Sequence, residues 1–595
     1  MSQEPRVQYS IHLESPKSHY ITVDLFIPEA PADRFELKLP TWLPGAYKLN
    51  EFSANIEQFK ASNGRQETVS WHKTDKLTWQ VNANTGQPVR IQYKVYAFQL
   101  ADDASYLSDD FAIINPGTIC LAVIPLMESP CSLAVILPDH WKDIATGLPL
   151  ADGENRRYRA TDYHHLMDCP MLIGNLYLHR FIAGGIPHEV AIQGKGNLDF
   201  DQFLADLEKI TACEIDMMQH IPYDRYVYLF LITDRDAGLE HCNSTLIFEH
   251  HFNFKPRKKY AEMISIFSHE LYHAWNVKAL RPQELVHPNY FTETYTDLLW
   301  VSEGFTNYYH YQFLLRPGVI NLKEYIEAVT YQVTRYRRFP GFEYQSTAEA
   351  SFDAWIKYYR QHENTPNSTI SYYLKGSMIA FFLDLDILEA TNGRHRLDDV
   401  MRELYQEHYV RKFDGFTYDD VVRTAEKYTG RKMDDFFRKF VYGTTDMPFE
   451  SYFQKVGLEL KAQDPDDDKM KKGNLGVRVT MREHRPHVSI VRRNSPAQDA
   501  GIQPNDEIVA MNGLRVFSDE GFTGRLEHMK PGDTVEIMLA RQHEVKTVTA
   551  VLGEPVPVKY TAKPIKNSGD DQRRLFTMWT GGNIDDLREV PCPDA

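Results

Sequence analysis

The stretch FSHELYHAWNVK, residues 267–278, decides which fold and which kind of site this chain builds. His269 and His273 lie four positions apart, so a helix places both imidazoles on one face. Glu270 follows the first histidine directly, and its carboxylate therefore lies beside the point on which the imidazoles converge. Neutral imidazoles bind zinc, and a free carboxylate next to them can take a proton from a water on the metal. The stretch predicts a metal-binding helix from about residue 259 to residue 276.

A catalytic zinc needs a third protein ligand and one position left open for water. The candidate is Glu303, thirty positions after His273 in the run DLLWVSEGFTNYY. Its neighbours are mostly apolar, and a carboxylate buried among them is costly unless it is protonated or faces a cation. Asn307 lies one helical turn further on and would support a metal-bound histidine through a hydrogen bond. The alternative for Glu303 is an exposed carboxylate on an amphipathic helix.

The wider sequence around these residues resembles a known family. HELYHAWNVKALRP, residues 269–282, and the later Trp-x-x-Glu-Gly-Phe resemble the glycyl aminopeptidases of peptidase family M61. That family lies within the gluzincin metallopeptidases, which include aminopeptidase N and thermolysin. The resemblance covers most of the chain. It implies a thermolysin-like catalytic domain, one zinc ion per chain and removal of small N-terminal residues such as Gly or Ala.

A motif upstream of the metal helix bears on substrate binding. Gly238-Leu-Glu240-His is similar to the Gly-x-Met-Glu-Asn motif of aminopeptidase N, although Leu239 and His241 depart from its Met and Asn. The similarity implies that Glu240 pairs with the protonated amine of a peptide N-terminus, with Gly238 beside it. Glu240 follows a strand-like run that starts at Tyr226. The alternative is a loop carboxylate that accepts hydrogen bonds from nearby amides.

A motif downstream of the metal helix bears on catalysis. Tyr372-Tyr373-Leu-Lys-Gly is similar to the segment that carries the catalytic tyrosine of aminopeptidase N. A phenol donates a hydrogen bond while it stays neutral near pH 7, so it can stabilise the oxyanion of peptide hydrolysis. We expect Tyr373 in this role, with Tyr372 as the alternative and structural packing as the default for any single tyrosine. Glu270 would act as the general base.

Composition excludes several classes of function. The net charge of −16 argues against a nucleic-acid partner, whose phosphates need a basic surface. The six cysteines are too few and too scattered for a disulfide framework, and none has the paired spacing of a structural zinc site. The most apolar run, residues 120–138, is interrupted by prolines and a glutamate, which excludes a membrane span. The N-terminus carries no signal sequence, so we expect a cytoplasmic protein, although a removed leader would leave no trace here.

Hydrophobic patterning indicates a multi-domain α+β chain. Residues 1–190 alternate apolar and polar positions, as in an antiparallel β domain, and residues 191–460 combine strands with long amphipathic helices around a metal cleft. The catalytic domain is thus expected to have an upper part of mixed strands and helices and a lower part that is mostly helical. The charged segment from Asp464 to Gly473 predicts a linker. Residues 557–595 form a polar tail whose apolar patch, residues 575–579, is expected to pack back on the body.

Residues 474–556 resemble a PDZ domain of the bacterial protease type. The supporting segments are Leu475-Gly476-Val477, NSPAQDAGIQPNDEI from Asn494, and Pro531-Gly-Asp. Such a domain binds the C-terminal segment of a partner along a sheet edge, and the backbone amides of Leu475, Gly476 and Val477 would hold the terminal carboxylate. The alternative is a groove filled by other segments of the same chain.

Three functions remain open from the sequence. The first is a zinc aminopeptidase acting on peptides. The second is an endopeptidase or another zinc hydrolase on the same scaffold, including an epoxide-opening enzyme. The third is a non-catalytic interaction protein with a PDZ-type groove and a structural metal. A structural site requires neither the base Glu270 nor an open coordination position, which favours the hydrolases.

Overall fold

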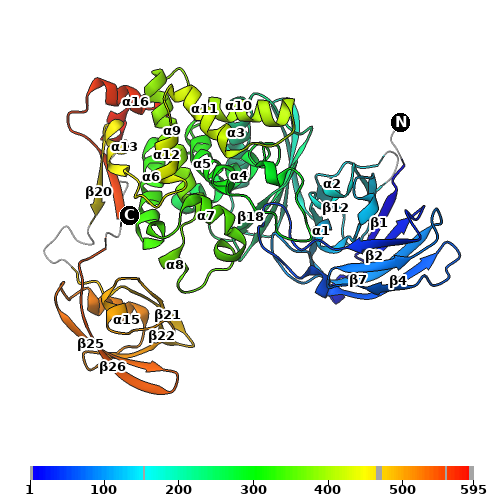
Figure 1. Ribbon diagram of the computed structural model, residues 1–595, viewed down its shortest axis with the longest axis horizontal. Helices are drawn as coiled ribbons and strands as arrows, with labels where there is room; N and C mark the ends of the chain where they lie inside the picture. Colours follow the sequence, from blue (N-terminus) through cyan, green and yellow to red (C-terminus); the bar gives the residue numbers. More distant parts are fainter. Residues whose placement is uncertain (1–3, 152–154, 464–471, 557–558, 589–595) are drawn as a thin grey trace. The chain divides into compact units, whose positions relative to one another are not determined.

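The computed structural model describes residues 4–151, 155–463, 472–556 and 559–588, and Figure 1 shows its elements. The chain divides into two compact units, Met1–Thr296 with Met401–Thr417, and Asp297–Val400 with Tyr418–Ala595. The predicted fold class is confirmed, since β-rich, mixed and helical regions follow one another and a small β domain comes last. Most of the predicted linker, up to residue 471, lies outside the described residues. No helix in the described part of the chain is long and apolar enough to cross a membrane.

The first unit begins with three sheets, and some of their strands, such as β1 (Val7–His12), alternate buried and partly exposed residues. The six-stranded sheet has the order β13-β11-β1-β2-β7-β4, and β1 pairs with β11 in parallel. Its other strands are β2 (Tyr20–Ile27), β4 (Ile56–Asn63), β7 (Val89–Tyr96), β11 (Cys131–Ile136) and β13 (Arg157–Ala160). One four-stranded sheet comprises β3 (Arg34–Lys38), β5 (Trp71–Lys73), β6 (Thr78–Asn82) and β10 (Ala122–Val123). The other comprises β8 (Tyr106–Leu107), β9 (Phe111–Ile114), β12 (Asp143–Thr146) and β14 (Met171–Gly174). The short helices α1 (Pro116–Ile119) and α2 (Tyr163–Met167) accompany them.

A five-stranded sheet in the same unit supports the metal helix. Its order is β15-β16-β17-β19-β18, in which β16, β17 and β19 are parallel and β18 is an antiparallel edge strand. The strands are β15 (Tyr177–Ala183), β16 (Ile186–Gln193), β17 (Tyr226–Thr233), β18 (Ala237–Glu240) and β19 (Ser244–His250), and the helices are α3 (Phe200–Met218) and α4 (Arg257–Tyr272). Phe203 of α3 and Phe230 of β17 both pack on Phe267 of α4, with ring centroids 5.0 Å apart in each pair. These contacts fix α4 against the sheet.

The second unit is mainly helical around α9 (Tyr372–Thr391), which is buried along nearly its whole length. A Cβ at Gly304 would lie 2.5 Å from the backbone of Gly376, so the π-helix η5 (Trp300–Phe305) crosses α9 backbone to backbone. The other helices are α5 (Thr306–Leu315), α6 (Leu322–Arg337), α7 (Thr347–Phe352), η7 (Ala354–Tyr358), α8 (Thr365–Ser368), α11 (Tyr418–Thr429), α12 (Asp434–Phe440) and α13 (Phe449–Lys455). Helix α10 (Leu397–Tyr405) spans the boundary between the units, and η8 (Gln406–Arg411) follows it.

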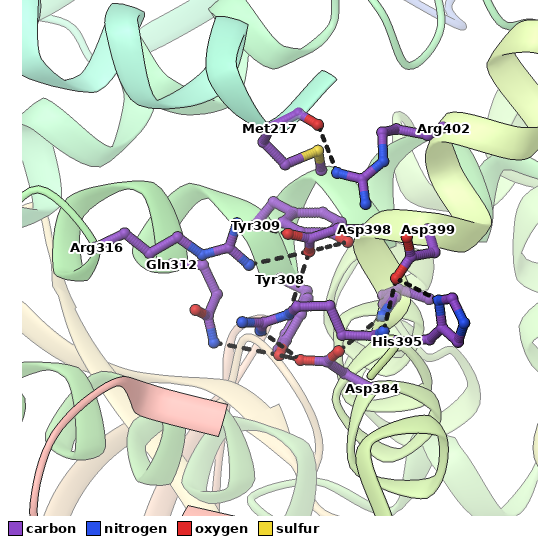
Figure 2. A network of polar contacts seen from close by, with 12 residues as sticks. Met217, Tyr308, Tyr309, Gln312, Arg316, Asp384, His395, Asp398, Asp399 and Arg402 are labelled. Atoms are coloured by element: carbon purple, nitrogen blue, oxygen red, sulfur yellow. Dashed lines mark hydrogen bonds and ion pairs between the residues drawn. The ribbon is translucent and has the colours of Figure 1, made fainter. Parts of the chain in front are cut away.

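A buried ionic network holds α5 to α9, and Figure 2 shows its members. Asp384, which is 0% exposed, accepts hydrogen bonds from Tyr308 at 2.6 Å and from Arg396 at 2.7 Å. Asp398 accepts two N–H groups of Arg316, at 2.8 and 3.0 Å. A buried charge is tolerated when it is paired and fully hydrogen-bonded, as both carboxylates are here.

The PDZ-like domain is inserted between two paired strands of the second unit. β20 (Leu458–Gln463) pairs with β27 (Lys559–Pro564) along its whole length. The inserted elements are β21 (Val477–Arg482), β22 (Arg485–Val491), α14 (Pro496–Asp499), β23 (Glu507–Met511), β24 (Leu514–Arg515), α15 (Asp519–Leu526), β25 (Thr534–Arg541) and β26 (Glu544–Val551). After β27, helix α16 (Asp570–Thr580) brings Trp579 onto Phe381 of α9, with ring centroids 5.1 Å apart. The apolar patch of the tail therefore packs on the body, as expected from the sequence.

Candidate metal centre and substrate pocket

Helix α4 aims its two histidines at one point. The Nε2 atoms of His269 and His273 lie 2.9 Å apart, and the rings are nearly perpendicular at 86°. The helix ends at Tyr272, earlier than the predicted residue 276, and His273 is its C-cap. The backbone N–H of His273 still bonds to the carbonyl of His269 at 3.3 Å, so the four-residue spacing keeps both rings on one face.

These imidazoles fit a divalent metal. Nδ1 of His273 donates to the carbonyl of Asn276 at 2.7 Å, which fixes the tautomer and leaves the Nε2 lone pair as the ligand. Two such lone pairs facing each other at 2.9 Å repel unless a proton or a cation lies between them. Zinc–nitrogen bonds of about 2.0–2.1 Å in a tetrahedral site place two nitrogens roughly 3.3 Å apart. Small ring movements therefore suffice to accommodate the ion.

Glu270 lies against the edge strand β18. A Cβ at Gly238 would lie 2.4 Å from Oε1 of Glu270, so residue 238 must be glycine for the carboxylate to keep its place. Oxygen atoms of Glu240 and Glu270 and a ring nitrogen of His273 all lie within 4.8 Å of one another. The structure thus brings the predicted base, the predicted amine-binding carboxylate and one predicted ligand together. No spacing or motif in the sequence indicates that Glu240 and Glu270 are neighbours.

Glu240 lines a cavity of about 280 Å³. The N-terminal β region contributes Trp42, Gly45 and Tyr47 to its wall, and Tyr290 lies on another part of the wall. A Cβ at Gly45, where φ is +102°, would lie 2.5 Å from Oε2 of Glu240. Trp42 is held by two hydrogen bonds of 2.9 Å from its Nε1 to backbone carbonyls. Sequence reasoning missed these residues, and only the turn-forming Pro44-Gly45 pair signals a special backbone there.

A buried ion pair fixes the segment that follows Glu240. Asp168 accepts the backbone N–H of Cys242 at 3.0 Å and the ammonium of Lys278 at 2.6 Å, and it contacts Nδ1 of His241 at 3.3 Å. Burial alone would raise the pKa of Asp168, but Lys278 and His241 outweigh it and hold that pKa well below its usual range. Burial lowers the pKa of His241. The residue that departs from the aminopeptidase N motif therefore has a role, since it helps to anchor the Glu240 segment.

The remaining predicted catalytic residues lie in the second unit. Glu303 is 1% exposed within η5. Burial and the charge of Glu303 raise the pKa of Tyr373 well above its usual value, so the Tyr373 phenol stays protonated near neutral pH. Tyr373 is half-buried, whereas Tyr372 is fully buried. Asn307 is half-buried on α5, and its side chain makes no hydrogen bond to any other residue that the structure describes.

Comparisons with known proteins agree with this arrangement. Residues 8–175 match the family model described as the Peptidase M61 N-terminal domain, residues 262–379 match M61 glycyl aminopeptidase, and residues 473–552 match a PDZ domain. The crystal structure of an aminopeptidase N family protein from Idiomarina loihiensis is 30% identical, with a TM-score of 0.89 over 96% of this chain and 99% of that one. The chain belongs to the M61 glycyl aminopeptidase family. It is accordingly a metallopeptidase with a C-terminal PDZ domain.

More distant similarities of this M61 peptidase are weak. An M1 zinc metallopeptidase from Deinococcus radiodurans is 13% identical, with a TM-score of 0.46 over 74% of this chain and 94% of that one. Yeast LTA4 hydrolase is also 13% identical, with a TM-score of 0.45 over 76% of this chain and 70% of that one. Similarity at this level carries no information on function. No curated protein matches the sequence.

The PDZ domain of this M61 peptidase carries a groove between β21 and α15. A cavity of about 270 Å³ is lined by the predicted loop residues Leu475, Gly476 and Val477 on one side and by Phe522 and Leu526 on the other. Gly476 has φ +83°, and a Cβ there would lie 2.3 Å from Ser495. The loop conformation that presents these backbone amides therefore requires glycine.

Proposed function

We propose that this M61 peptidase is a zinc-dependent aminopeptidase that removes small N-terminal residues, Gly or Ala, from peptides. The observation that carries the proposal is the convergence of His269 and His273 beside Glu270, with Glu240 within 4.8 Å of Glu270 and of His273. Spacing and family resemblance supply the third ligand, Glu303, so that one ion is held per chain. The open position that a catalytic site keeps would then face the cavity.

Each of these side chains has a separate role in hydrolysis. A zinc ion bound here would polarise the scissile carbonyl and lower the pKa of water towards about 7. Glu270 accepts the proton from the attacking water and returns it to the leaving amine. Tyr373, held in its neutral form, donates a hydrogen bond to the oxyanion, with Tyr372 as the alternative donor. Asn307 remains a candidate for supporting a metal-bound histidine.

Two features of the cavity support an aminopeptidase over a general endopeptidase. Glu240 ends the edge strand and offers its carboxylate to the cavity, where a protonated amine would pair with it. The rings of Trp42, Tyr47 and Tyr290 also line the cavity and offer apolar surface to the N-terminal residue of a substrate. The preference for Gly or Ala itself rests on the family resemblance.

The central experiment compares Glu270→Gln with the wild type on Gly-, Ala- and Leu-linked fluorogenic amides, with and without a chelator. We expect the variant to lose about 10²–10⁴-fold in kcat while it keeps one zinc per chain. The wild type should prefer Gly and Ala over Leu and lose its activity with the chelator. Loss of zinc from the variant would show that Glu270 is a ligand or a structural group and not the base.

A second experiment separates the aminopeptidase from the endopeptidase. Glu240→Ala should reduce kcat/KM at least tenfold for peptides with a free amine and leave N-acetylated peptides unaffected, because only the ammonium group contacts the carboxylate. Glu128→Gln, an exposed carboxylate of the same unit, is the matched control. Equal losses on free and blocked peptides would instead favour an endopeptidase or another zinc hydrolase.

For the PDZ domain we propose binding of C-terminal peptide segments, with the terminal carboxylate at the amides of residues 475–477. Among the described residues, the groove keeps a cavity of about 270 Å³, which supports binding of a partner's segment over a groove filled by the same chain. Peptides with a free C-terminus should bind, and their C-terminal amides should bind at least tenfold more weakly. Equal binding of both forms would contradict carboxylate recognition.

A further inference from the structure

A second group of metal-binding side chains lies at the wall of the Glu240 cavity. His165, Cys169 and Cys242 each offer a ligand atom, and the three atoms lie within 4.8 Å of one another. They come from different places in the fold: His165 from α2, Cys169 from the segment before β14, and Cys242 from the segment after β18. Because they lie far apart in the sequence, no short spacing pattern indicates a metal site there.

The two thiols converge on one acceptor. Both Cys169 and Cys242 direct their S–H groups at Oδ1 of Asn243, at 3.8 and 3.6 Å. The amide of Asn243 is in turn fixed by a bond from Nδ2 to the carbonyl of Gly147 at 3.0 Å. A Cβ at Gly147 would lie 2.0 Å from Oδ1 of Asn243, so glycine is required for this arrangement. Burial and the adjacent thiol raise the pKa of Cys169, so this sulfur stays protonated when no cation is bound.

The imidazole is oriented for ligation. Nδ1 of His165 lies 3.3 Å from both the backbone nitrogen and Oγ1 of Thr161. Within the part of the chain that the structure describes, Nε2 has no hydrogen-bond partner. The backbone N–H of Thr161 donates to Nδ1, so the proton of the neutral ring is on Nε2 in the metal-free protein. Ligation by Nε2 therefore requires the other tautomer, in which the proton moves to Nδ1 and is donated to Oγ1 of Thr161 after a small turn of the ring.

The group is accessible from solvent. His165 and Cys242 both line the 280 Å³ cavity, whereas Cys169 is fully buried behind them. Two sulfurs and one imidazole favour soft or borderline cations over Mg²⁺ or Ca²⁺. Three protein ligands with a cavity on the fourth side correspond to an open tetrahedral site.

We propose that His165, Cys169 and Cys242 form a second metal site, distinct from that of α4, which binds a thiophilic divalent cation such as Zn²⁺ or Cd²⁺. Binding forms two metal–sulfur bonds and one metal–nitrogen bond, and the two thiol protons pass to solvent. Two thiolates balance the charge of the cation. Ligand atoms in a tetrahedral zinc site lie about 3.3–3.8 Å apart, and the present separations do not exceed 4.8 Å, so the side chains need to close by at most about 1.5 Å.

If the protein is the aminopeptidase proposed above, a cation at this second site would also affect the binding of its substrate. Cys242 lies two positions after Glu240, and both line the same cavity. Because the two thiolates neutralise the cation, its effect on a substrate at Glu240 comes from space and not from charge: the ion and the water at its open position take up part of the cavity that the N-terminal residue would use. Excess Zn²⁺ or Cd²⁺ should therefore raise the KM for free-amine substrates, and Cys242→Ser should abolish that effect.

The test is a cadmium titration of the full-length, reduced protein loaded with one zinc per chain, followed by ultraviolet absorption from sulfur-to-cadmium charge transfer and by equilibrium dialysis. The expected result is one strongly absorbing cadmium per chain, bound at least tenfold more weakly in Cys242→Ser, Cys169→Ser and His165→Ala. Cys213→Ser, a half-buried cysteine on α3, is the matched control and should bind as the wild type does. Exchange of cadmium into the α4 site gives no such absorption, because that site contains no sulfur.

Two outcomes would overturn the proposal. One is a reduced wild type without charge-transfer absorption, and the other is full absorption in the Cys169→Ser, Cys242→Ser double variant. Cys242 and His165 are only partly buried, so their single variants keep the test valid if Cys169→Ser does not fold. Because the readout is sulfur-specific binding, it is independent of whether the aminopeptidase assignment holds.

Discussion

Asp168 and Asp384 are both buried carboxylates bound to a cationic side chain, yet their surroundings differ. Asp384 is enclosed in the helical unit beside Tyr308 (Figure 2), and Tyr308, Arg396 and a backbone N–H donate hydrogen bonds to it. Asp168 is 8% exposed and lines the cavity that contains Glu240. An enclosed pair serves the fold, because nothing else can reach it. A pair at a cavity wall fixes the position of groups that must meet a ligand.

The largest effect is expected from Asp384→Asn. The change leaves the buried guanidinium of Arg396 without its main counter-charge, and breaking such a pair costs about 3–5 kcal/mol of unfolding free energy. The kcat/KM of the protein that remains folded should be unchanged. Chemical denaturation and steady-state kinetics measure both quantities.

Asp435→Asn is the control for that variant, because Asp435 forms only exposed ion pairs on α12 and should contribute less than about 1 kcal/mol. A loss of activity in folded Asp384→Asn would contradict a purely structural role. So would a destabilisation no larger than that of Asp435→Asn.

A smaller effect of another kind is expected from Asp168→Asn. The variant weakens the anchor of the segment after Glu240, so kcat/KM for free-amine substrates should fall about tenfold, or about 1.4 kcal/mol. N-blocked substrates should be affected less. Asp109→Asn, at a half-exposed ion pair of the same unit, is the control. Equal losses of kcat/KM on free-amine and N-blocked substrates would show that Asp168, like Asp384, serves only the fold.

A third effect, on stability and its pH dependence, concerns a buried cation that contacts no carboxylate among the residues that the structure describes. Lys375 of α9 is 0% exposed and donates to the carbonyl of Gly443 at 3.2 Å. Burial lowers the pKa of Lys375 to about 8 from its usual 10.5, although Asp446 and Glu349 oppose the shift. Between these values the unfolded chain binds the proton more strongly than the folded one, so stability should rise with pH by up to about 1.4 kcal/mol per unit.

Denaturation of the wild type and Lys375→Met between pH 8 and pH 9.5 measures this dependence, which the variant should lose. Lys357→Met, at a partly exposed ion pair, should retain it. A wild type whose stability is flat over this range would show that Lys375 has an ordinary pKa.

The sequence predicted what depends on local spacing. The histidine pair, Glu270 and the β-rich, helical and PDZ-type regions follow from residues close together in the chain. The contact between Gly45 and Glu240 could not be predicted, because it arises from the packing of segments nearly two hundred residues apart. The same holds for Cys169 and Cys242, which have no short-range pattern.

The local helix geometry could not be predicted from the sequence where it depends on the packing of two backbone segments. The pattern of Trp300–Phe305 predicts an ordinary helix, but the structure has a π-helix there. The close approach of Gly304 to Gly376 accompanies this irregularity, and neither glycine reveals it when read alone. Helix α4 likewise ends at Tyr272 although the apolar pattern continues past it.

The pairing of β20 with β27 has a consequence for how the PDZ domain is attached. Gln463, the last residue of β20, is opposite Lys559, the first residue of β27, so the chain leaves and re-enters the helical body at the same place. A protease that cut one connection would not release the domain, since the other strand and Trp579 would still anchor it. If the PDZ domain and both of its connections were replaced by a short turn from β20 to β27, the peptidase body should still fold, because the two ends to be joined are adjacent.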